Sequence, residues 1–149
     1  MFGRILESIR ERRGAAFELL AAAPIFLLLA YGIIEFGRGL MVSNMVKNAA
    51  REGARLALQE GVTNDDVTAS IQMIMNGALG VAADNIEVVI TTTPGDGNPD
   101  PANRISHCQP GDLIKVTVHV PYDQVALGPA NYLVKNRVSG QSEVRFQQF

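Results

Sequence analysis

The sequence predicts an α+β protein: a long N-terminal transmembrane helix that continues into an amphipathic stalk, one further helix, and a small antiparallel sheet of about three strands. An almost unbroken apolar run occupies residues 15–34, and helical spacing of apolar residues then continues to about residue 79. Beyond residue 80 the period of the pattern changes to two. Because strands follow helices instead of alternating with them, the α+β class is favoured.

The apolar run at residues 15–34 carries one charge, Glu18. At about 1.5 Å per residue, some 20 helical residues match a hydrocarbon core of about 30 Å. A cleaved secretory signal has an apolar region of about 7–15 residues, followed by a cleavage site with small residues. Here the run is longer, and its three alanines at 21–23 lie inside it. We therefore expect a transmembrane helix at residues 15–36.

The basic residues predict the orientation of this helix. A leader at residues 1–14 contains Arg4, Arg10, Arg12 and Arg13, whereas Arg38 alone lies within a few residues after the apolar run. Lys and Arg accumulate on the cytoplasmic side of membrane helices. The N-terminus is therefore expected in the cytoplasm, and the bulk of the chain on the far side of the membrane.

Residues 37–60 form the predicted stalk. Small residues recur there at steps of four and allow a close approach of another element. That element is either the protein's own domain, which is the favoured interpretation, or a neighbouring copy, and both can hold on different faces. Glu35 and Arg38 are spaced to form an ion pair where the helix leaves the bilayer. The residues expected in helix packing are Gly32, Phe36, Met45, Ala49, Gly53 and Ala57.

Residues 61–149 are predicted to form the extracytoplasmic α+β domain. A helix at 63–79 begins at a cap residue, Thr63 or Asn64, and ends at Gly80. Alternating apolar and polar residues predict strands at 86–92, 113–120 and 138–146. Two long connections, 94–111 and 121–136, are candidates for contacts with partners. The residues expected on the apolar stripe of the helix are Val67, Ile71, Ile74 and Ala78.

Composition and motifs argue against several functions. The net charge of −2 and the pI of about 5.6 give no broad basic surface for nucleic acid. No nucleophile elbow, phosphate-binding loop or zinc motif is present, so we expect no enzyme, no cofactor and no small-molecule substrate. The DGNPD segment at 96–100 is typical of a turn. His107, Cys108 and His119 lack the regular spacing of a metal site.

Glu18 is a candidate functional residue because an ionisable side chain inside a membrane segment is costly. Two interpretations remain open. The carboxylate can snorkel to the nearby cytoplasmic interface, or it can meet a positive group on another subunit. The positive group could be an N-terminal amine exposed by processing. The pair would set the axial register between neighbouring helices.

Four segments of the N-terminal third resemble TadE-like proteins, which are pilin-like components of the tight-adherence (Flp, type IVb) pilus system. The segments agree with that family in order and spacing. They are RRGAAFEL at 12–19, Pro24, YGIIEFGR at 31–38 and NAAREGAR at 48–55.

The resemblance implies a structural or assembly subunit with one helix in the bacterial inner membrane. It also implies a prepilin peptidase that cuts after Gly14 and leaves Ala15 as the new N-terminus. In the family the glutamate usually lies one residue farther from the glycine than Glu18 lies from Gly14. Implied partners are other pilin-like subunits, the tight-adherence secretion machinery and the lipid bilayer. The alternatives are a permanently anchored extracytoplasmic binding domain that does not polymerise, and an anchored enzyme.

Overall fold

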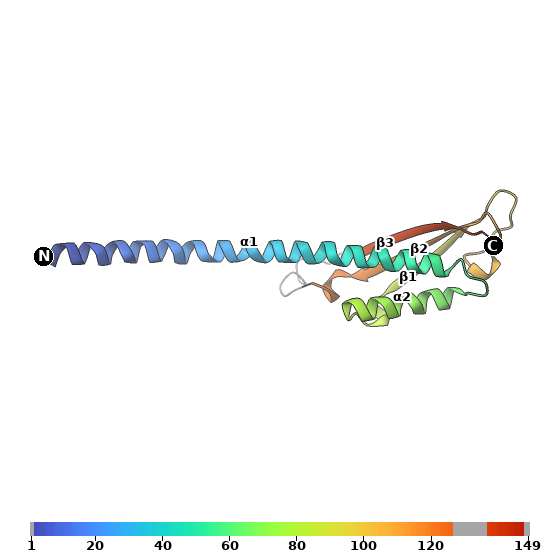
Figure 1. Ribbon diagram of the computed structural model, residues 1–149, viewed down its shortest axis with the longest axis horizontal. Coiled ribbons are helices and arrows are strands. Elements are labelled where there is room, and N and C mark those ends of the chain that lie inside the picture. The colour runs from blue at the N-terminus through green and yellow to red at the C-terminus, as the bar shows by residue number, and fades with distance from the viewer. Residues whose placement is uncertain (1, 127–136, 148–149) are drawn as a thin grey trace. The chain divides into compact units, whose positions relative to one another are not determined.

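The computed structural model describes residues 2–126 and 137–147, with side chains from Glu18 onward. The chain divides into two compact units, Met1–Gly37 and Arg38–Phe149, and each is described by itself. The first unit consists of the N-terminal part of helix α1 (Phe2–Leu56). The second unit contains the rest of α1, helix α2 and a three-stranded sheet (Figure 1).

Helix α1 is continuous over Phe2–Leu56 and contains Pro24. The prediction of one long helix through the apolar run and the stalk is confirmed, although the helix begins earlier than residue 15 and ends at Leu56, before the predicted end of the stalk at residue 60. Its end is followed by a turn in which Gly61 has a φ of +77°. This left-handed conformation suits glycine, and it reverses the chain toward α2.

Helix α2 (Asn64–Leu79) begins and ends as its sequence predicts. Thr63 caps the N-terminus in a capping box with Asp66, and Gly80 closes the C-terminus with a φ of +68°. Met75 is buried, whereas Ile74 and Ala78 are exposed. The predicted apolar stripe is therefore wrong at these two positions. Helix α2 is rotated about its axis so that Met75, and not Ile74, faces the core of the domain.

The sheet contains β1 (Glu87–Thr93), β2 (Leu113–Pro121) and β3 (Arg137–Arg145) in the order β1-β2-β3, with antiparallel neighbours. Val118 of β2 pairs with Val88 on one side and with Gly140 on the other. The three predicted strands and their buried faces are thus confirmed. The fully buried side chains of the central strand are Ile114, Val116, Val118 and Val120.

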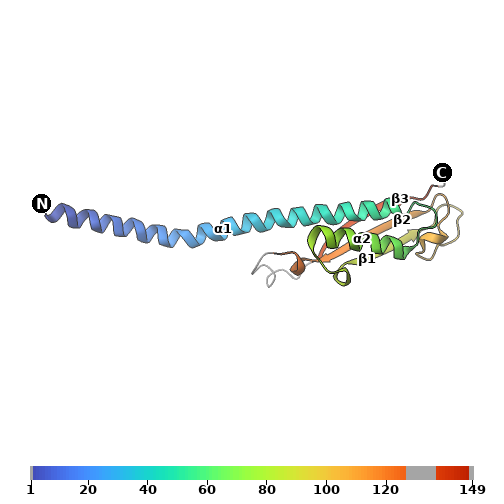
Figure 2. The same cartoon turned by 60° about the horizontal axis from the view of Figure 1, so that its bottom comes forward.

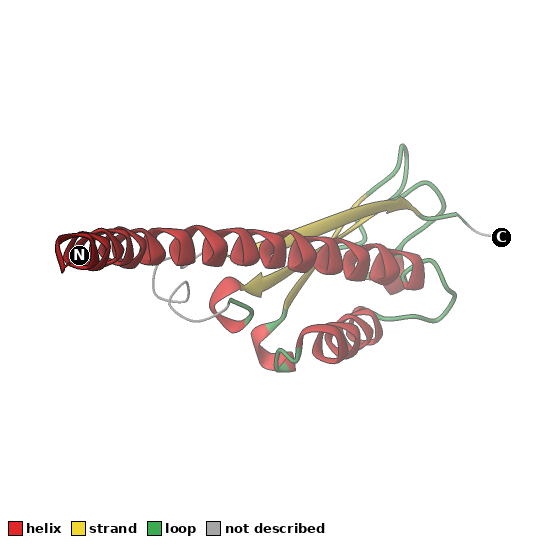
Figure 3. Ribbon diagram, turned by 60° about the vertical axis from the view of Figure 1, so that its left-hand side comes forward, coloured by secondary structure: helices red, strands yellow, loops and turns green. Residues whose placement is uncertain are grey.

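Both helices of the second unit lie on one face of the sheet (Figure 3). Figures 1 and 2 show α2 running back beside the end of α1. A Cβ atom at Gly53 of α1 would lie 2.4 Å from Cδ1 of Ile71, so the two helices approach closely there. A Cβ atom at Gly140 of β3 would lie 2.7 Å from the backbone nitrogen of Lys47. Glycine at these positions lets α1 pack against α2 and β3 at once.

The opposite face of the sheet is polar and carries two cross-strand ion pairs. Lys115 Nζ lies 3.1 Å from Glu143 Oε1, and Arg137 Nη1 lies 2.5 Å from Glu87 Oε2. Such exposed pairs each contribute about 0–1 kcal/mol. The second unit is therefore a two-layer domain, with helices on one face of its sheet and polar side chains on the other.

Candidate functional site

The first candidate site is the apolar surface of α1 between Leu19 and Phe36. Ten large apolar side chains lie there, each more than half exposed. Moving one such side chain out of water is worth about 1.5–3 kcal/mol, so ten amount to on the order of 15–30 kcal/mol. Of the helices that the structure describes, one, Glu18–Leu56, is long and apolar enough to cross a bilayer. The arrangement is that of a membrane anchor.

The predicted processing residues lie at the start of this surface. The helix runs through Gly14 and Ala15 without a break. Both residues lie before Glu18, where the description of side chains begins. Glu18 is exposed and directly precedes Leu19, the first of those ten apolar side chains. Cleavage after Gly14 and the pairing of Glu18 remain predictions.

The residues expected in helix packing fall into two groups. Gly32 and Phe36 belong to the first unit, where Phe36 is 70% exposed and a Cβ atom on Gly32 would meet no atom within 4 Å. In the second unit Ala49, Gly53 and Ala57 are buried, and Met45 is half-buried. The small residues of the stalk therefore pack within their own domain, as the favoured interpretation has it. The packing of Gly32 and Phe36 against another helix remains a prediction.

Arg38 holds the connection after β2 against α1. Its Nε donates a hydrogen bond to the carbonyl oxygen of Val125. One residue further on, a Cβ atom at Gly39 would lie 3.5 Å from Oη of Tyr122. A short 3₁₀ helix at Tyr122–Gln124 begins this connection. Residues 127–136 of that connection lie outside the described residues. Glu35 belongs to the other unit, so its ion pair with Arg38 remains a prediction.

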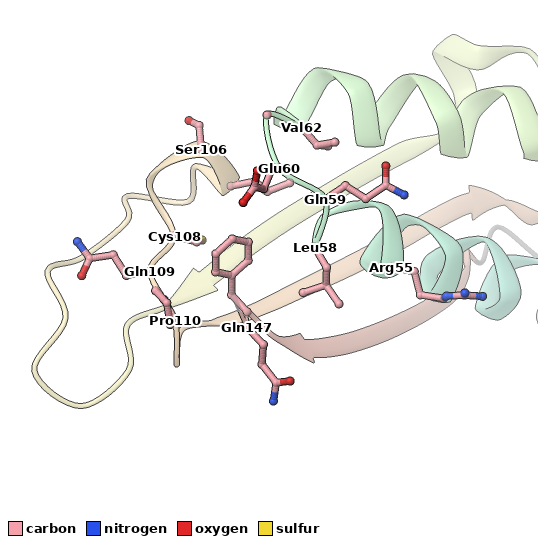
Figure 4. A pocket seen from close by; sticks show the side chains of 13 residues that line it. Arg55, Leu58, Gln59, Glu60, Val62, Ser106, Cys108, Gln109, Pro110 and Gln147 are labelled. Atoms are coloured by element: carbon pink, nitrogen blue, oxygen red, sulfur yellow. The ribbon is translucent and has the colours of Figure 1, made fainter. Parts of the chain in front are cut away.

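The second candidate site is a groove of about 930 Å³ at the end of the domain where α1 stops (Figure 4). Side chains from the end of α1, from the following turn, from the loop before β2 and from the segment after β3 surround it. Apolar groups come from Leu58, Val62, Ile105 and Phe146, and charged groups from Arg55 and Glu60.

Cys108 lines the same groove as a half-buried free thiol. Its Sγ lies 3.6 Å from the carbonyl oxygen of Arg104 and donates to it. Burial, together with the negative charge of Asp112, raises the pKa of the thiol to about 11. A thiol with this pKa stays protonated near neutral pH and is a poor nucleophile.

Asp112 orders the first long loop, a role that the sequence analysis missed. Its side chain is fully buried, and Oδ1 accepts hydrogen bonds from the backbone nitrogen of Gly95 at 2.8 Å and from Asn98 Nδ2 at 2.7 Å. Oδ2 accepts another from the backbone nitrogen of Gln109 at 2.7 Å. Burial acts to raise the pKa of Asp112, but these hydrogen bonds outweigh it, so the pKa lies below its ordinary value. The signal available in the sequence was the Pro-Gly-Asp turn motif directly before the strand β2. In the structure Gly111 of this motif has a φ of +103°.

The other polar residues of the loop make turns. Asp100 Oδ1 accepts a hydrogen bond from the backbone nitrogen of Ala102, and Asn103 exchanges two hydrogen bonds with Thr92. His107 is exposed, and His119 is half-buried on β2. Within residues 18–126 and 137–147, no group of three His, Cys, Asp or Glu side chains is placed to hold a metal ion.

The geometry defines a class of protein: a long helix with an exposed apolar segment, whose C-terminal third is built into a small α+β domain. Residues 14–55 of this chain match the model of the family described as TadE-like protein, as the resemblance predicted. The match covers the apolar segment of α1 and the part of the helix that packs in the domain, and it leaves residues 56–149 unmatched. No curated protein and no solved structure is significantly similar to the chain.

Proposed function

We propose that this protein is a pilin-like structural or assembly subunit of a tight-adherence (Flp, type IVb) pilus. The match of residues 14–55 to TadE-like protein carries the proposal. It spans the helix whose ten exposed apolar side chains require a bilayer or a bundle of similar helices around them. No enzymatic reaction is part of the proposed function.

The proposed location is the bacterial inner membrane, with the N-terminus in the cytoplasm and the α+β domain outside. Four arginines precede the apolar run, which supports this orientation. Before assembly, lipid covers residues 19–36. During assembly, similar helices of other pilin-like subunits replace the lipid, and Glu18 pairs with a cation of a neighbour.

Proposed processing after Gly14 is tested by determining the N-terminal residue. The full chain is expressed in bacterial membranes with and without a prepilin peptidase of the tight-adherence system, and intact mass spectrometry identifies the terminus. We expect Ala15 as the new terminus with the peptidase, and Met1 with Gly14→Leu. Gly32→Leu is the matched control, because it adds the same side chain to the same helix where nothing lies within 4 Å. It is expected to be cleaved normally.

Assembly is tested by following the protein into sheared surface filaments of a strain that carries the complete pilus system. We expect the protein in the filament fraction or in a detergent-stable complex with the secretion machinery. An uncleaved terminus together with absence from both fractions would contradict the proposal. That result would favour the permanently anchored binding domain, for which the groove beside Leu58 and Phe146 is the place to look for a ligand.

A further inference from the structure

The two edges of the sheet differ in how their backbone groups are covered. Strands β1 and β3 are both edge strands, because β2 lies between them. At the edge of β1, the backbone nitrogen of Thr92 donates a hydrogen bond to Asn103 Oδ1 at 2.9 Å, so the loop before β2 closes part of that edge. The edge of β3 has no such cover among the described residues.

The backbone of β3 presents every second residue to this open edge. Phe146, just after the strand, exchanges backbone hydrogen bonds with Gly111 and Asp112 and therefore points toward β2. Because this direction alternates along an antiparallel strand, the even-numbered residues of β3 bond to β2 and the odd-numbered ones point outward. Within the described part of the chain, the outward backbone groups form no hydrogen bond. The outward residues are Arg137, Ser139, Gln141, Glu143 and Arg145.

The middle of this edge lacks the usual protection of an edge strand. Natural edges are commonly blunted by charged side chains, prolines or bulges, which prevent pairing with another chain. In β3 the side chains of Arg137 and Glu143 are held toward the sheet by ion pairs with Glu87 of β1 and Lys115 of β2. Residues 139–142 between them carry no charge and include no proline. The edge of β3 is therefore open to an added strand.

Helix α1 places a line of cations beside the same strand. Lys47, Arg51 and Arg55 follow each other at steps of four and are all exposed; we call them the basic stripe. At one end of the stripe, the backbone of Lys47 packs on Gly140, where a Cβ atom would lie 2.7 Å from the lysine nitrogen. At the other end, Arg55 lines the same groove as Phe146. The stripe therefore follows β3 from Gly140 to its end (Figure 1).

The basic stripe lies on the flank of α1 that faces away from α2. Gly53 marks the flank toward α2, because a Cβ atom there would lie 2.4 Å from Cδ1 of Ile71. Each residue turns the helix by about 100°, so Arg51, two residues earlier, lies nearly opposite Gly53. The stripe is thus directed past β3, toward the space beside its open edge.

The cations around this edge are largely without acidic partners. Within residues 18–126 and 137–147, Lys47, Arg51 and Arg145 form no ion pair, and Arg55 makes one exposed pair with Glu52 at 3.7 Å. A partner that carries carboxylates would therefore gain charge-assisted contacts here without displacing a strong ion pair of this chain.

From the open edge and the basic stripe we infer that β3 binds an extended acidic segment of a partner protein, which adds a fourth strand to the sheet. The backbone of that segment pairs with the outward groups of β3, as in other cases of strand addition. Because side chains alternate between the two faces of a strand, carboxylates at every second position lie on the side of α1 and meet the stripe.

The open edge favours a polypeptide over a lipid as the partner. A lipid headgroup supplies negative charge for the stripe, but it has no row of alternating donors and acceptors to pair with β3. The inference goes beyond the proposed function and does not rest on it.

Binding of a synthetic peptide to the full chain in a neutral detergent tests the inference. The probe is a labelled peptide of eight residues that alternates threonine and glutamate, and fluorescence anisotropy follows its binding. We expect saturable binding, with slower hydrogen exchange at the amides of Ser139, Gln141 and Glu143. The amides of Val88 and Ile90 on the other edge should exchange as before. In the control peptide proline replaces threonine; it keeps the charge but cannot form a strand, and should bind about tenfold more weakly or less.

Variants of the protein separate the edge from the stripe. Gln141→Pro removes an outward N–H but no bond to β2, and is expected to weaken binding by about tenfold or more. Gln141→Ala keeps the N–H and should bind as the natural sequence does. Arg51→Glu is expected to weaken binding by about fivefold or more, whereas Arg104→Glu, the same change in the loop beside β1, should have no effect. Circular dichroism establishes that each variant is folded, and the proline peptide decides if Gln141→Pro is not.

Three results would overturn the inference: no binding of the threonine–glutamate peptide, equal binding of the proline peptide, or binding that leaves exchange at Ser139 and Gln141 unchanged. Protection of these two amides that rises with protein concentration in the absence of peptide would assign the edge to a second copy and overturn it as well. These outcomes are separate from those of the proposed function, which depends on the N-terminal residue and on the fractions that contain the protein.

Discussion

Along α1, residues 19–36 and residues 42–56 share one helical backbone but differ in the size and burial of their apolar side chains. The first segment carries large side chains that are more than half exposed, whereas the buried positions of the second are mostly valine, alanine and glycine. Small side chains permit close approach of a helix and a strand, and large ones maximise contact with lipid or with other helices. Side-chain size along one helix thus indicates what covers each part.

Substitution by arginine in each segment gives the largest expected effects, and the effects are of different kinds. Leu28→Arg places a charge in the exposed apolar segment and opposes membrane insertion by about 2.5–3.5 kcal/mol. Val46→Arg, at a fully buried position, leaves an uncompensated charge in the core. We expect it to lower the free energy of unfolding of the domain by on the order of 3–5 kcal/mol. We expect Leu28→Arg to raise the fraction of the protein that alkaline carbonate extracts from membranes, without changing the protease resistance of the domain. Val46→Arg is expected to stay in the membrane with a protease-sensitive domain.

The same loss of anchoring or of folding in both variants would show that the two segments are not separate in function. Leu28→Ile and Val46→Ile serve as controls, because each keeps an apolar side chain of similar shape. Both controls are expected to behave like the natural sequence in the extraction and in the protease assay.

Glycine substitutions sharpen the comparison. Gly140→Ala brings a Cβ atom to 2.7 Å from the backbone of Lys47, and a helix backbone cannot yield easily, so we expect a loss of about 1–3 kcal/mol. Gly53→Ala meets the flexible end of Ile71 instead and should cost less. Gly32→Ala, in the exposed segment, meets nothing within 4 Å. Thermal unfolding of the full chain in mild detergent should give midpoints that rise in the order Gly140→Ala, Gly53→Ala, Gly32→Ala, and equal midpoints would contradict the packing.

Local patterns of the sequence predicted the elements of the fold but not how they meet. Helix α1, the caps of α2 and the alternation in β2 are encoded in neighbouring residues, through hydrophobic period, capping chemistry and turn glycines. The rotation of α2 that buries Met75 instead of Ile74 depends on contacts with α1 and the sheet. The close approach at Gly140 depends on which part of α1 crosses β3, and no local pattern of the strand encodes that.

The candidate site was predictable to a similar extent. Exposure of the segment around Phe36 follows from a run of apolar residues too long for the domain to cover. The groove and Asp112 were missed because they form where the end of α1, a long loop and the end of β3 come together. An aspartate beside a glycine is most often a turn residue at the surface. Its burial becomes visible only when Gly95, Asn98 and Gln109 converge on it.

Acid should weaken the domain-packed segment through Asp112. The folded-state pKa of Asp112 lies below its ordinary value of 3.8. The ionised carboxylate therefore stabilises the folded domain fully when the pH is above this ordinary value. The stabilisation is lost as the pH falls through the folded-state pKa. Asp112→Asn cannot accept all three hydrogen bonds, and we expect it to lose about 1–3 kcal/mol at neutral pH. Its unfolding midpoint should also fall less between pH 5 and pH 2 than that of the natural sequence (about the range in which carboxyls titrate).

Asp96→Asn is the control for the acid effect, because Asp96 is exposed in the same loop. It should leave the midpoint at neutral pH unchanged. Part of the acid dependence should persist in Asp112→Asn, since hydrogen bonds from Thr63 also lower the pKa of Asp66. An unchanged midpoint in Asp112→Asn at neutral pH would refute the role of Asp112 in closing the loop.

The smallest expected effect lies at the N-cap of α2 and separates the two segments of α1 most finely. Thr63→Ala removes the hydroxyl that accepts from the backbone of Asp66, and such losses cost about 1 kcal/mol. Because Gly53 packs against α2, amides near Gly53 should exchange with solvent faster in the variant, while those of residues 19–36 keep their protection in the bilayer. Thr63→Ser keeps the hydroxyl and should exchange as the natural sequence does. If amide exchange accelerated equally along all of α1, the helix would open as one unit. The two segments would then differ in what surrounds them but not in local stability.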